Sequence, residues 1–537
     1  MNPAMRSQLV PCLALMGVLT LLSVPVIFYG LGDYGLVNGD EGVYHSISRN
    51  MLESGNWWRL EFTGEHRIYD TFMNSPLQYW LRGNVIRVLG DNYWSMRISS
   101  AVFAWLSVLA LFTLVWWMAT PRAAFLAALA QLTTFQFIYQ HGARTGELEP
   151  FVCFLLIAAA LTFLRGIFEG RSFALHVLCI GLLANFKMPL VILPLLADLA
   201  FFAVASEHRP HLRRWLIACL FLPLAFVWHL AQFFWIGEEV SHAFRSMLGK
   251  IAPSDPAAKV KGLASPLYYA WVIFFGAFPF SVAYPFAIAD NLRRPGKADD
   301  ESRKLLLLLL YAVVVYLFFC FLDVRYPWYV LPAIPFLSAL LGVWLDRFGM
   351  DRGVVISVVA PALLVSLLLC LEPATYNPFS IQGWHPQWGG IAWRDSGPVS
   401  AAWICPILFL ATGGVALWAR SRLEARYPLL LLPILCALLF APAFLRVLRP
   451  LQFLDTQSEV ETLHQELHRQ LSSGQPLRYP IEVRELGPLK VRYFFGDDFR
   501  IIKARGRPGV RYLLTGPRQT PRYPGQRQRP ASRSNPP

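Results

Sequence analysis

Residues 9–41 read LVPCLALMGVLTLLSVPVIFYGLGDYGLVNGDE, a long apolar run from Leu9 to Tyr29 followed shortly by the acidic pair Asp40-Glu41. The run is long enough to cross a bilayer as a helix. The pair opens a polar segment that ends near Arg97, where the next apolar run begins. Carboxylates at the mouth of a membrane bundle are costly, so we treat this pair as a candidate functional site.

The composition is that of a polytopic membrane protein. Of 537 residues, 55% are hydrophobic and 15% are charged, and the mean hydropathy is +0.43. A soluble domain this apolar would expose large aggregation-prone patches. The first run has only Arg6 before it and no small-residue cleavage site after it, so we expect a retained helix instead of a signal peptide.

About thirteen apolar runs have the length and hydropathy of a membrane-spanning helix. They are Leu9–Tyr29, Ile98–Ala119, Ala123–Tyr139, Leu148–Leu164, Phe173–Phe186, Leu190–Ala205, Trp215–Trp235, Pro266–Ala289, Leu305–Leu322, Trp328–Leu345, Val354–Leu371, Ala401–Ala419 and Tyr427–Leu445.

Basic residues gather in alternate connections between these runs, and this pattern predicts the topology. Such loops stay in the cytoplasm. The first loop, the turn His141–Glu147, the turn at Lys187 and everything after Leu448 then face outward. The formal charge of +14 is therefore mainly a topology signal, and no nucleic-acid partner is expected. We expect a bacterial inner-membrane protein whose active site is periplasmic.

The chain is predicted to have three parts. Residues 1–447 form the transmembrane domain, including a first periplasmic loop at 31–97. Residues 448–515 form a small periplasmic α/β domain, with helical spacing in Val460, Leu463, Leu467 and Leu471 and strands at Lys490–Phe494, Arg500–Ile502 and Val510–Leu514. Residues 516–537 are a basic tail rich in Pro, Arg, Gln and Ser, and we expect it to be disordered.

Within the first loop, Tyr44, Ile47 and Met51 fall on one helical face, ahead of Trp57-Trp58. This pattern predicts an amphipathic helix that lies along the membrane surface with aromatic anchors.

The carboxylates Asp40 and Glu41 lead the candidate catalytic residues. A carboxylate at this mouth can deprotonate an acceptor hydroxyl or phosphate, or hold a divalent cation. The alternative is a solvated pair that caps the helix starting near Gly42.

A second polar group, Arg144, Glu147 and Glu149, lies at the outward ends of two spans. Two cations at other outward turns, Lys187 and Arg325, can clamp a phosphate leaving group against the carboxylates. The alternative for these cations is snorkelling, together with a local Asp323–Arg325 pair.

Several other chemistries are not supported by the sequence. It contains no P-loop, no G-x-G-x-x-G at a strand–helix junction and no H-E-x-x-H. An outward-facing site also fits a lipid-linked sugar phosphate better than a cytoplasmic nucleotide sugar.

Six short motifs, in order along the first two-thirds of the chain, resemble the lipid A aminoarabinose transferase (ArnT) and protein O-mannosyltransferase superfamily. They are Asp40-Glu41, Asn74–Leu81 (NSPLQYWL), Trp94–Ser100 (WSMRISS), Ala143–Phe151 (ARTGELEPF), Phe186–Pro189 (FKMP) and Arg325–Pro335 (RYPWYVLPAIP). The C-terminal part also resembles the periplasmic domain of ArnT-type enzymes.

The resemblance implies a GT-C fold and a donor sugar carried on a polyprenyl phosphate such as undecaprenyl phosphate. It matches Asp40 to the catalytic acid of the first loop and Glu149 to a second acidic position, and Lys187 and Arg325 to basic positions near the donor phosphate. The family often reads Lys-Pro-Pro where this chain has Asn74-Ser75-Pro76, which argues against assuming aminoarabinose as the sugar.

We therefore expect an inverting, integral-membrane glycosyltransferase, acting as a monomer on lipid A or another envelope glycolipid. The predicted catalytic residues are Asp40, Glu41 and Glu149, and Asp40 is the base. Lys187, Arg325 and Arg144 bind the donor phosphate. Other predicted substrate contacts are Tyr44, Arg97, Glu147 and Tyr326.

Two alternatives remain open from the sequence. One is a transferase of the same fold that glycosylates a protein or an exported polymer. The other is a polytopic transporter or flippase, which would need polar groups near the midplane and internal repeats. No cofactor is assigned, although the carboxylates can hold a divalent cation.

Overall fold

Two compact units make up the chain in this computed structural model. One comprises Met1–Phe62 and His66–Leu454, and the other comprises Thr63–Glu65 and Asp455–Pro537. The structure describes residues 9–33, 36, 39–58, 60, 75–139, 141–236, 264–277, 280–293, 299–322, 326–348, 463–467, 469–470, 473, 481–484, 499–503 and 510–517.

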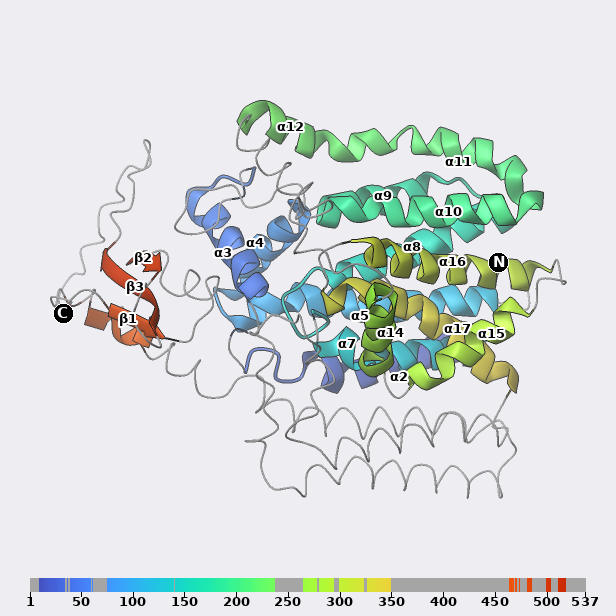
Figure 1. Cartoon of the computed structure of the whole chain (residues 1–537), viewed down its shortest axis with the longest axis horizontal. Helices are drawn as coiled ribbons and strands as arrows, with labels where there is room; N and C mark the ends of the chain where they lie inside the picture. Colours follow the sequence, from blue (N-terminus) through green and yellow to red (C-terminus); the bar gives the residue numbers. More distant parts are fainter. Residues whose placement is uncertain are drawn as a thin grey trace, which may run out of the picture. The chain divides into compact units, whose positions relative to one another are not determined.

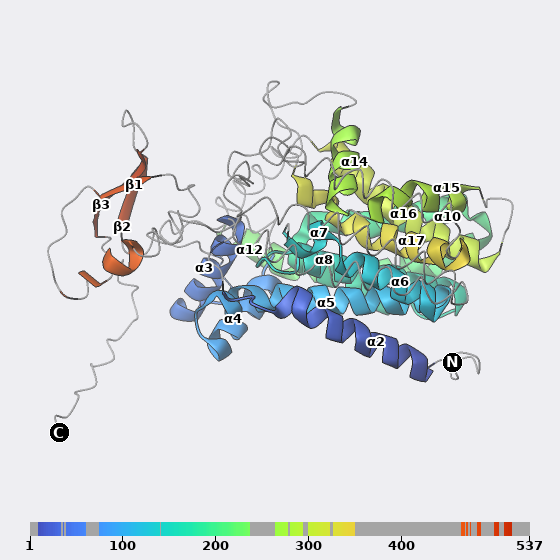
Figure 2. The same cartoon turned by 90° about the horizontal axis from the view of Figure 1, so that it is seen from below.

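The described part of the larger unit is helical (Figures 1 and 2). Its elements, in chain order, are α2 (Leu9–Ser23), η1 (Val24–Phe28), α3 (Gly39–Ser54), α4 (Leu77–Leu89), α5 (Tyr93–Met118), α6 (Pro121–Leu132), α7 (Phe135–Tyr139), α8 (Glu149–Phe168), α9 (Ala174–Lys187), η2 (Met188–Val191), α10 (Ile192–Val204), η3 (Ser206–His211), α11 (Leu212–Cys219), η4 (Leu222–Phe226), α12 (Val227–Ile236), α14 (Ala264–Gly276), η6 (Phe280–Ala283), α15 (Tyr284–Leu292), α16 (Asp300–Phe321), η7 (Pro327–Ala333) and α17 (Ile334–Phe348).

Among the described residues, seven stretches are long and apolar enough to cross a membrane. They are Leu9–Phe28, Tyr93–Met118, Glu149–Phe168, Ala174–Val204, Ser206–Gln232, Asp300–Phe321 and Pro327–Arg347. The helical, multi-pass architecture is therefore confirmed. The last three predicted spans, from Val354 to Leu445, lie outside the described residues, so the count of thirteen stays a prediction.

Several predicted spans are divided among helical elements in the structure. Residues 123–139 divide into α6 and α7, residues 215–235 into α11, η4 and α12, and residues 266–289 into α14, η6 and α15. None of these three is one uniform α-helix.

The stretch Ala174–Val204 is a helical hairpin, as the two separate predictions on either side of Lys187 anticipated. His176 Nε2 lies 2.8 Å from Asp198 Oδ2, whereas 22 residues of unbroken helix would separate them by roughly 33 Å. The chain must therefore reverse between α9 and α10. Trp215 and Tyr311 also donate to the Asp198 carboxylate, at 3.2 and 3.1 Å, so this buried acid joins four helices.

Small residues allow the central helices to approach closely. Helix α6 carries a run of fully buried alanines, and a Cβ on Gly342 of α17 would meet the Ala123 carbonyl oxygen at 2.5 Å. Small side chains at such crossings let helix backbones pack tightly in a membrane. Helices α5, α6, α8 and α17 form the core of the unit in this way.

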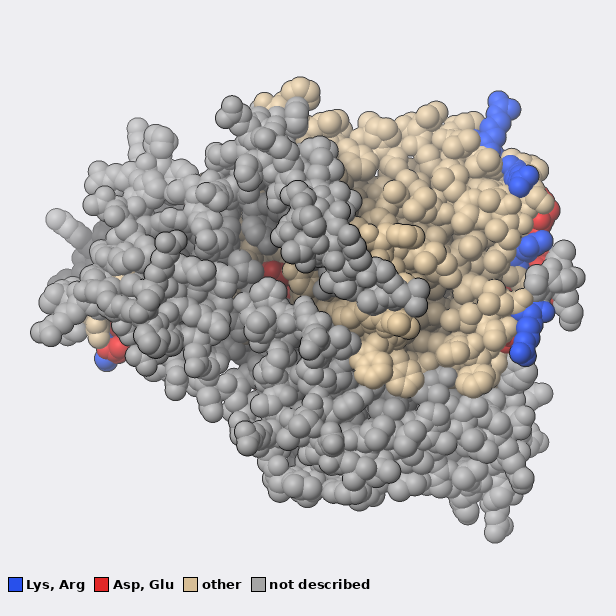
Figure 3. Space-filling view, viewed as in Figure 1, with Lys and Arg blue, Asp and Glu red and all other residues tan. Residues whose placement is uncertain are grey.

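Charged residues distinguish one end of the bundle. Arg122 pairs with Asp346 and Arg303 with Glu207, which links helix ends at that side, and Arg165 pairs with Glu169 at the end of α8. On the face shown in Figure 3, the blue side chains of the larger unit gather at this end. We call it the basic end. The predicted catalytic carboxylates lie on elements at the opposite end.

Helix α3 is present where an amphipathic surface helix was predicted, but its environment differs. Tyr44, Ile47 and Met51 are buried as expected. The polar side chains Glu41 and His45 are buried too, and both are fully enclosed. The helix packs against α4 and α5, and polar side chains on it have ion-pair partners within the protein. It therefore differs from the predicted surface helix, which would bury its apolar face alone.

In the smaller unit, the described strands form a three-stranded antiparallel sheet in the order β1 (Ile481–Arg484), β3 (Val510–Pro517), β2 (Phe499–Lys503). The predicted strands at Arg500–Ile502 and Val510–Leu514 lie within β2 and β3. Strand β1 was missed, and Lys490–Phe494 lies outside the described residues. The boundaries at 448 and 515 and the periplasmic placement stay predictions.

Candidate active site

The acidic pair lies in the first turn of α3, where a helix N-terminus favours negative charge. Its two members have different environments. Asp40 is partly exposed, whereas Glu41 is fully buried. Arg97 of α5 donates to both Glu41 oxygens, from Nη2 at 2.8 Å and from Nε at 3.2 Å. Since Arg97 also donates to the Leu31 carbonyl at 3.0 Å, it fixes both the helix and the loop before it.

A tight turn from His141 to Leu148 brings the second polar group against this pair. The backbone N–H of Gly146 donates to Glu41 Oε2 at 3.0 Å, and Arg82 Nη2 donates to the Gly146 carbonyl at 2.6 Å. A Cβ on Gly146 would lie 2.7 Å from the Met96 carbonyl oxygen. Glycine is therefore required here by close backbone approach.

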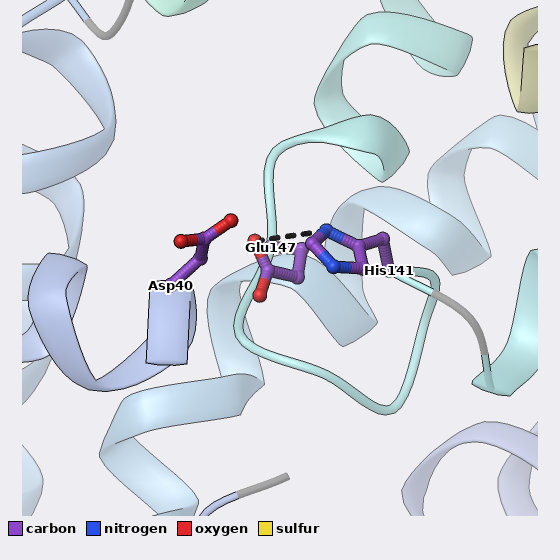
Figure 4. Close-up of side chains that lie close together, drawn as sticks. All are labelled: Asp40, His141 and Glu147. Atoms are coloured by element: carbon purple, nitrogen blue, oxygen red, sulfur yellow. Dashed lines mark ion pairs between the residues drawn. The ribbon is translucent and has the colours of Figure 1, made fainter. Parts of the chain in front are cut away.

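Asp40, His141 and Glu147 come together at the tip of this arrangement (Figure 4). One side-chain oxygen or nitrogen from each lies within 4.8 Å of the others. His141 Nδ1 is 3.4 Å from Glu147 Oε2, and the imidazole stacks on Trp328 with ring centroids 3.6 Å apart. The ring is therefore held in place by both an ion pair and a stacking contact.

The charges in this group perturb one another's protonation. Burial opposes the charged form of His141, but the carboxylates of Glu147, Glu149 and Asp40 raise its pKa above the usual value. Burial also raises the pKa of Glu147, with Asp40 and Glu149 adding to the effect and His141 opposing it. The His141–Glu147 pair consequently retains a proton more readily than either residue would in water.

Lys187 extends this group through Glu149. Its Nζ donates to Glu149 Oε1 at 2.8 Å and lies 5.6 Å from the centre of the Tyr329 ring. Glu149 Oε2 in turn is 3.9 Å from His141 Nδ1. The predicted positions Glu147, Glu149 and Lys187 are thus brought into one continuous network with Asp40.

The predicted substrate contacts have varied surroundings. Tyr326 stacks on Trp328, with centroids 4.6 Å apart, and so extends the His141 stack. Tyr44 is buried edge-on against Tyr79. Arg325 lies outside the described residues.

Three of the predicted site residues bind other parts of the chain. Arg97 and Glu41 are fully buried and bind each other, an arrangement that positions the site. Arg144 donates to the carbonyls of Val26, Ile27 and Gly30 at 3.2–3.4 Å and so satisfies the carbonyl end of the first span. The predicted catalytic role of Glu41, substrate contact of Arg97 and phosphate contact of Arg144 stay predictions.

The sequence interpretation missed His141, Trp328 and Arg82. His141 precedes a glycine and adopts a positive φ of 53°, a turn that the apolar pattern does not reveal. The sequence around Arg82 in α4 has no feature that marks this residue as functional, yet Arg82 is almost fully buried beside Glu147 and Glu41. A buried Arg so close to an acidic segment was the signal that could have found it.

Comparisons with known proteins find similar membrane glycosyltransferases. The family of dolichyl-phosphate-mannose-protein mannosyltransferases matches residues 73–235. An undecaprenyl phosphate-alpha-4-amino-4-deoxy-L-arabinose arabinosyl transferase from Edwardsiella ictaluri is 25% identical over 449 residues, which cover 76% of this chain and 73% of the relative. One from Pseudomonas savastanoi pv. phaseolicola is 39% identical over 102 residues, only 18% of each chain.

The fold gives the same answer. A crystal structure of ArnT from Cupriavidus metallidurans bound to undecaprenyl phosphate superimposes with a TM-score of 0.68, at 18% identity, over 89% of this chain and 84% of that one. This chain therefore has an ArnT-like GT-C fold. The arabinosyltransferase EmbB from Mycobacterium smegmatis superimposes with a TM-score of 0.50 at 16% identity. The match covers 88% of this chain and 45% of EmbB.

The buried Glu41–Arg97 pair should be essential for the stability of the transferase. Breaking such a pair leaves one uncompensated buried charge, so Glu41→Gln or Arg97→Gln should each cost about 3–5 kcal/mol of folding free energy. We expect a large loss of monodisperse protein on heating in detergent, measured by size-exclusion chromatography.

The matched control is Glu53→Gln, which removes the exposed partner of Arg49 on the same helix and should cost less than about 1 kcal/mol. The double variant Glu41→Gln/Arg97→Gln should be no worse than the poorer single variant, because the two residues act as one pair. Strictly additive losses would contradict the pairing.

Proposed function

We propose that this transferase moves a sugar from a polyprenyl phosphate, such as undecaprenyl phosphate, to an acceptor on the periplasmic face of the inner membrane. The observation that carries the proposal is the network of Asp40, His141, Glu147, Glu149 and Lys187 at the end of the bundle opposite the basic end. The named relatives use undecaprenyl-phosphate-linked aminoarabinose, and the ArnT structure holds undecaprenyl phosphate, which supports a donor of this class.

The charge distribution supports the sidedness. Basic residues at bundle ends remain on the cytoplasmic side of a membrane. If the basic end faces the cytoplasm, Asp40 and Lys187 face the periplasm, where a lipid-linked sugar is the available donor. The lipid tail would then remain in the bilayer beside the helices while its sugar phosphate enters the site.

The chemistry assigns one role to each part of the network. Asp40, the partly exposed member of the pair, takes the proton of the acceptor nucleophile as its lone pair attacks the anomeric carbon. The bond from that carbon to the phosphate oxygen breaks on the opposite face, so the configuration inverts. The phosphate leaves as an anion whose charge is balanced by Lys187 and by Arg325.

The acceptor is proposed to be lipid A or another envelope glycolipid. Protein or exported-polymer glycosylation is the alternative within the same fold, and transport is less favoured because the network lies at a bundle end. Mass spectrometry of lipid A and envelope polymers from a deletion strain and its parent should show one sugar-modified glycolipid missing from the deletion strain. A change confined to proteins or polymers would reassign the acceptor.

The first prediction from this mechanism concerns Asp40. Asp40→Asn keeps the size of the side chain but removes the base, so turnover of a polyprenyl-phosphate sugar should fall at least ~10²-fold with donor binding largely intact. Turnover and donor binding are measured separately on purified protein. Glu53→Gln, at the exposed far end of α3, should behave as the native chain. Near-native turnover in Asp40→Asn would remove the catalytic assignment.

The second prediction concerns the cationic clamp. Lys187→Ala and Arg325→Ala should each remove roughly 2–4 kcal/mol of transition-state stabilisation, because each balances charge on the leaving phosphate. Both variants should insert and purify normally, and Lys187→Arg should recover part of the activity. The control is Lys304→Ala at the basic end, where Nζ lies 4.6 Å from the Trp117 ring. Full turnover in Lys187→Ala and Arg325→Ala would reduce both residues to snorkelling cations.

A further inference from the structure

The geometry around Asp40 also fits a metal ion. Asp40, His141 and Glu147 each offer one ligand atom, and these atoms lie within 4.8 Å of one another. Ligands about 2.0–2.2 Å from a shared cation are separated from each other by roughly 3–4.4 Å, so a small closing movement would complete the site. In Figure 4 the Glu147 carboxylate lies between the Asp40 carboxylate and the His141 ring.

A second observation points to a ligand at the same place. Glu147 is 1% exposed, and its Oε1 has no hydrogen-bond partner among the described residues. A buried carboxylate oxygen without a donor carries a large desolvation cost unless a cation or ordered water satisfies it. His141 occupies only the other oxygen, Oε2.

The candidate ligands are held in place before any ion arrives. His141 is stacked on Trp328, and Ser100 Oγ donates to the Glu147 carbonyl at 2.7 Å. The backbone position of Asp40 is set by its neighbour Glu41, whose carboxylate accepts hydrogen bonds from Arg97 and from the Gly146 N–H. Supporting contacts of this kind, which orient the ligands themselves, are characteristic of metal sites.

We propose that Asp40, His141 and Glu147 bind one divalent first-row transition-metal ion. Two carboxylates and one imidazole form a mixed oxygen–nitrogen set, which suits Mn²⁺ or Zn²⁺ better than the all-oxygen preference of Mg²⁺ and Ca²⁺. The ion would add positive charge beside the carboxylates of Asp40, Glu147 and Glu149, where Lys187 contacts Glu149 and the buried Arg82 lies near Glu147.

The role of this ion in catalysis rests on the proposed function. A cation bound at these three residues can accept an oxygen of the donor phosphate and balance its charge as the sugar leaves, beside Lys187. Asp40 would use one carboxylate oxygen for the ion and keep the other for the proton of the acceptor. Binding of the ion itself does not depend on which sugar is transferred.

The test is a titration of purified, EDTA-stripped full-length protein with Mn²⁺, following the electron paramagnetic resonance signal of the free ion. We expect one Mn²⁺ per chain, displaced by Zn²⁺. Glu147→Gln and His141→Phe should each weaken binding at least ~10-fold, comparable to or greater than the loss of a supporting contact. His141→Phe keeps a ring to stack on Trp328, so it guards against a folding failure in Glu147→Gln.

The control is Asp91→Asn, which alters the separate His45–Asp91 pair and should leave Mn²⁺ binding unchanged. Absence of a stoichiometric site, or native affinity in both ligand variants, would overturn the proposal. Full turnover of a lipid-phosphate sugar by protein that binds no Mn²⁺ would also refute it while leaving the proposed function standing. Stoichiometric Mn²⁺ binding at these residues without such turnover would support the site and contradict the proposed function.

Discussion

The arrangement of the active site depends on one buried contact, the Glu41 carboxylate between Arg97 and the Gly146 N–H. It joins the first turn of α3, the first turns of α5 and the turn before α8, which are 56 and 105 residues apart from Glu41 in sequence. A fully buried ion pair carries a high desolvation cost and is retained only where its geometry satisfies both charges. Here Arg97 contacts both Glu41 oxygens, so the pair can position its partly exposed neighbour Asp40.

Around that contact, the bundle separates its charges by function. At the basic end, pairs such as Arg122–Asp346 join helix termini. At the other end, Lys187 donates to Glu149 of the acidic network, and Arg82 lies buried beside Glu147 and donates to the Gly146 carbonyl. Burial lowers the pKa of Arg82, but the Glu147 and Glu41 carboxylates oppose that shift. The proposed orientation in the membrane and the proposed donor site both rest on this separation.

Much of this architecture follows from sequence patterns, because apolar runs of spanning length and the alternation of basic loops are local properties. The hairpin at Lys187 was predicted from a polar interruption as small as Asn185, Lys187 and Pro189, and the His176–Asp198 contact requires it. Asp40, Glu147, Glu149 and Lys187 were also named from the sequence, since charges at bundle mouths are rare. Their assembly into one network is what the structure adds.

What the sequence did not reveal are the long-range contacts of several polar side chains. Arg97 was predicted as a substrate contact, and the structure pairs its guanidinium with Glu41 on α3. Arg144 was grouped with the phosphate clamp because it neighbours Glu147, but its guanidinium turns to the carbonyls of the first span. His141 was missed because its stacking partner, Trp328, is far away in sequence. None of these contacts has a signature within a window of neighbouring residues.

The most direct test of the central claim is the anomeric configuration of the sugar before and after transfer. Purified protein in lipid nanodiscs would be given a polyprenyl-phosphate sugar of defined configuration and an envelope glycolipid extract, and the product would be analysed by nuclear magnetic resonance. We predict transfer with release of the polyprenyl phosphate and complete inversion at the anomeric carbon. Retention of configuration would contradict direct attack by an acceptor activated at Asp40.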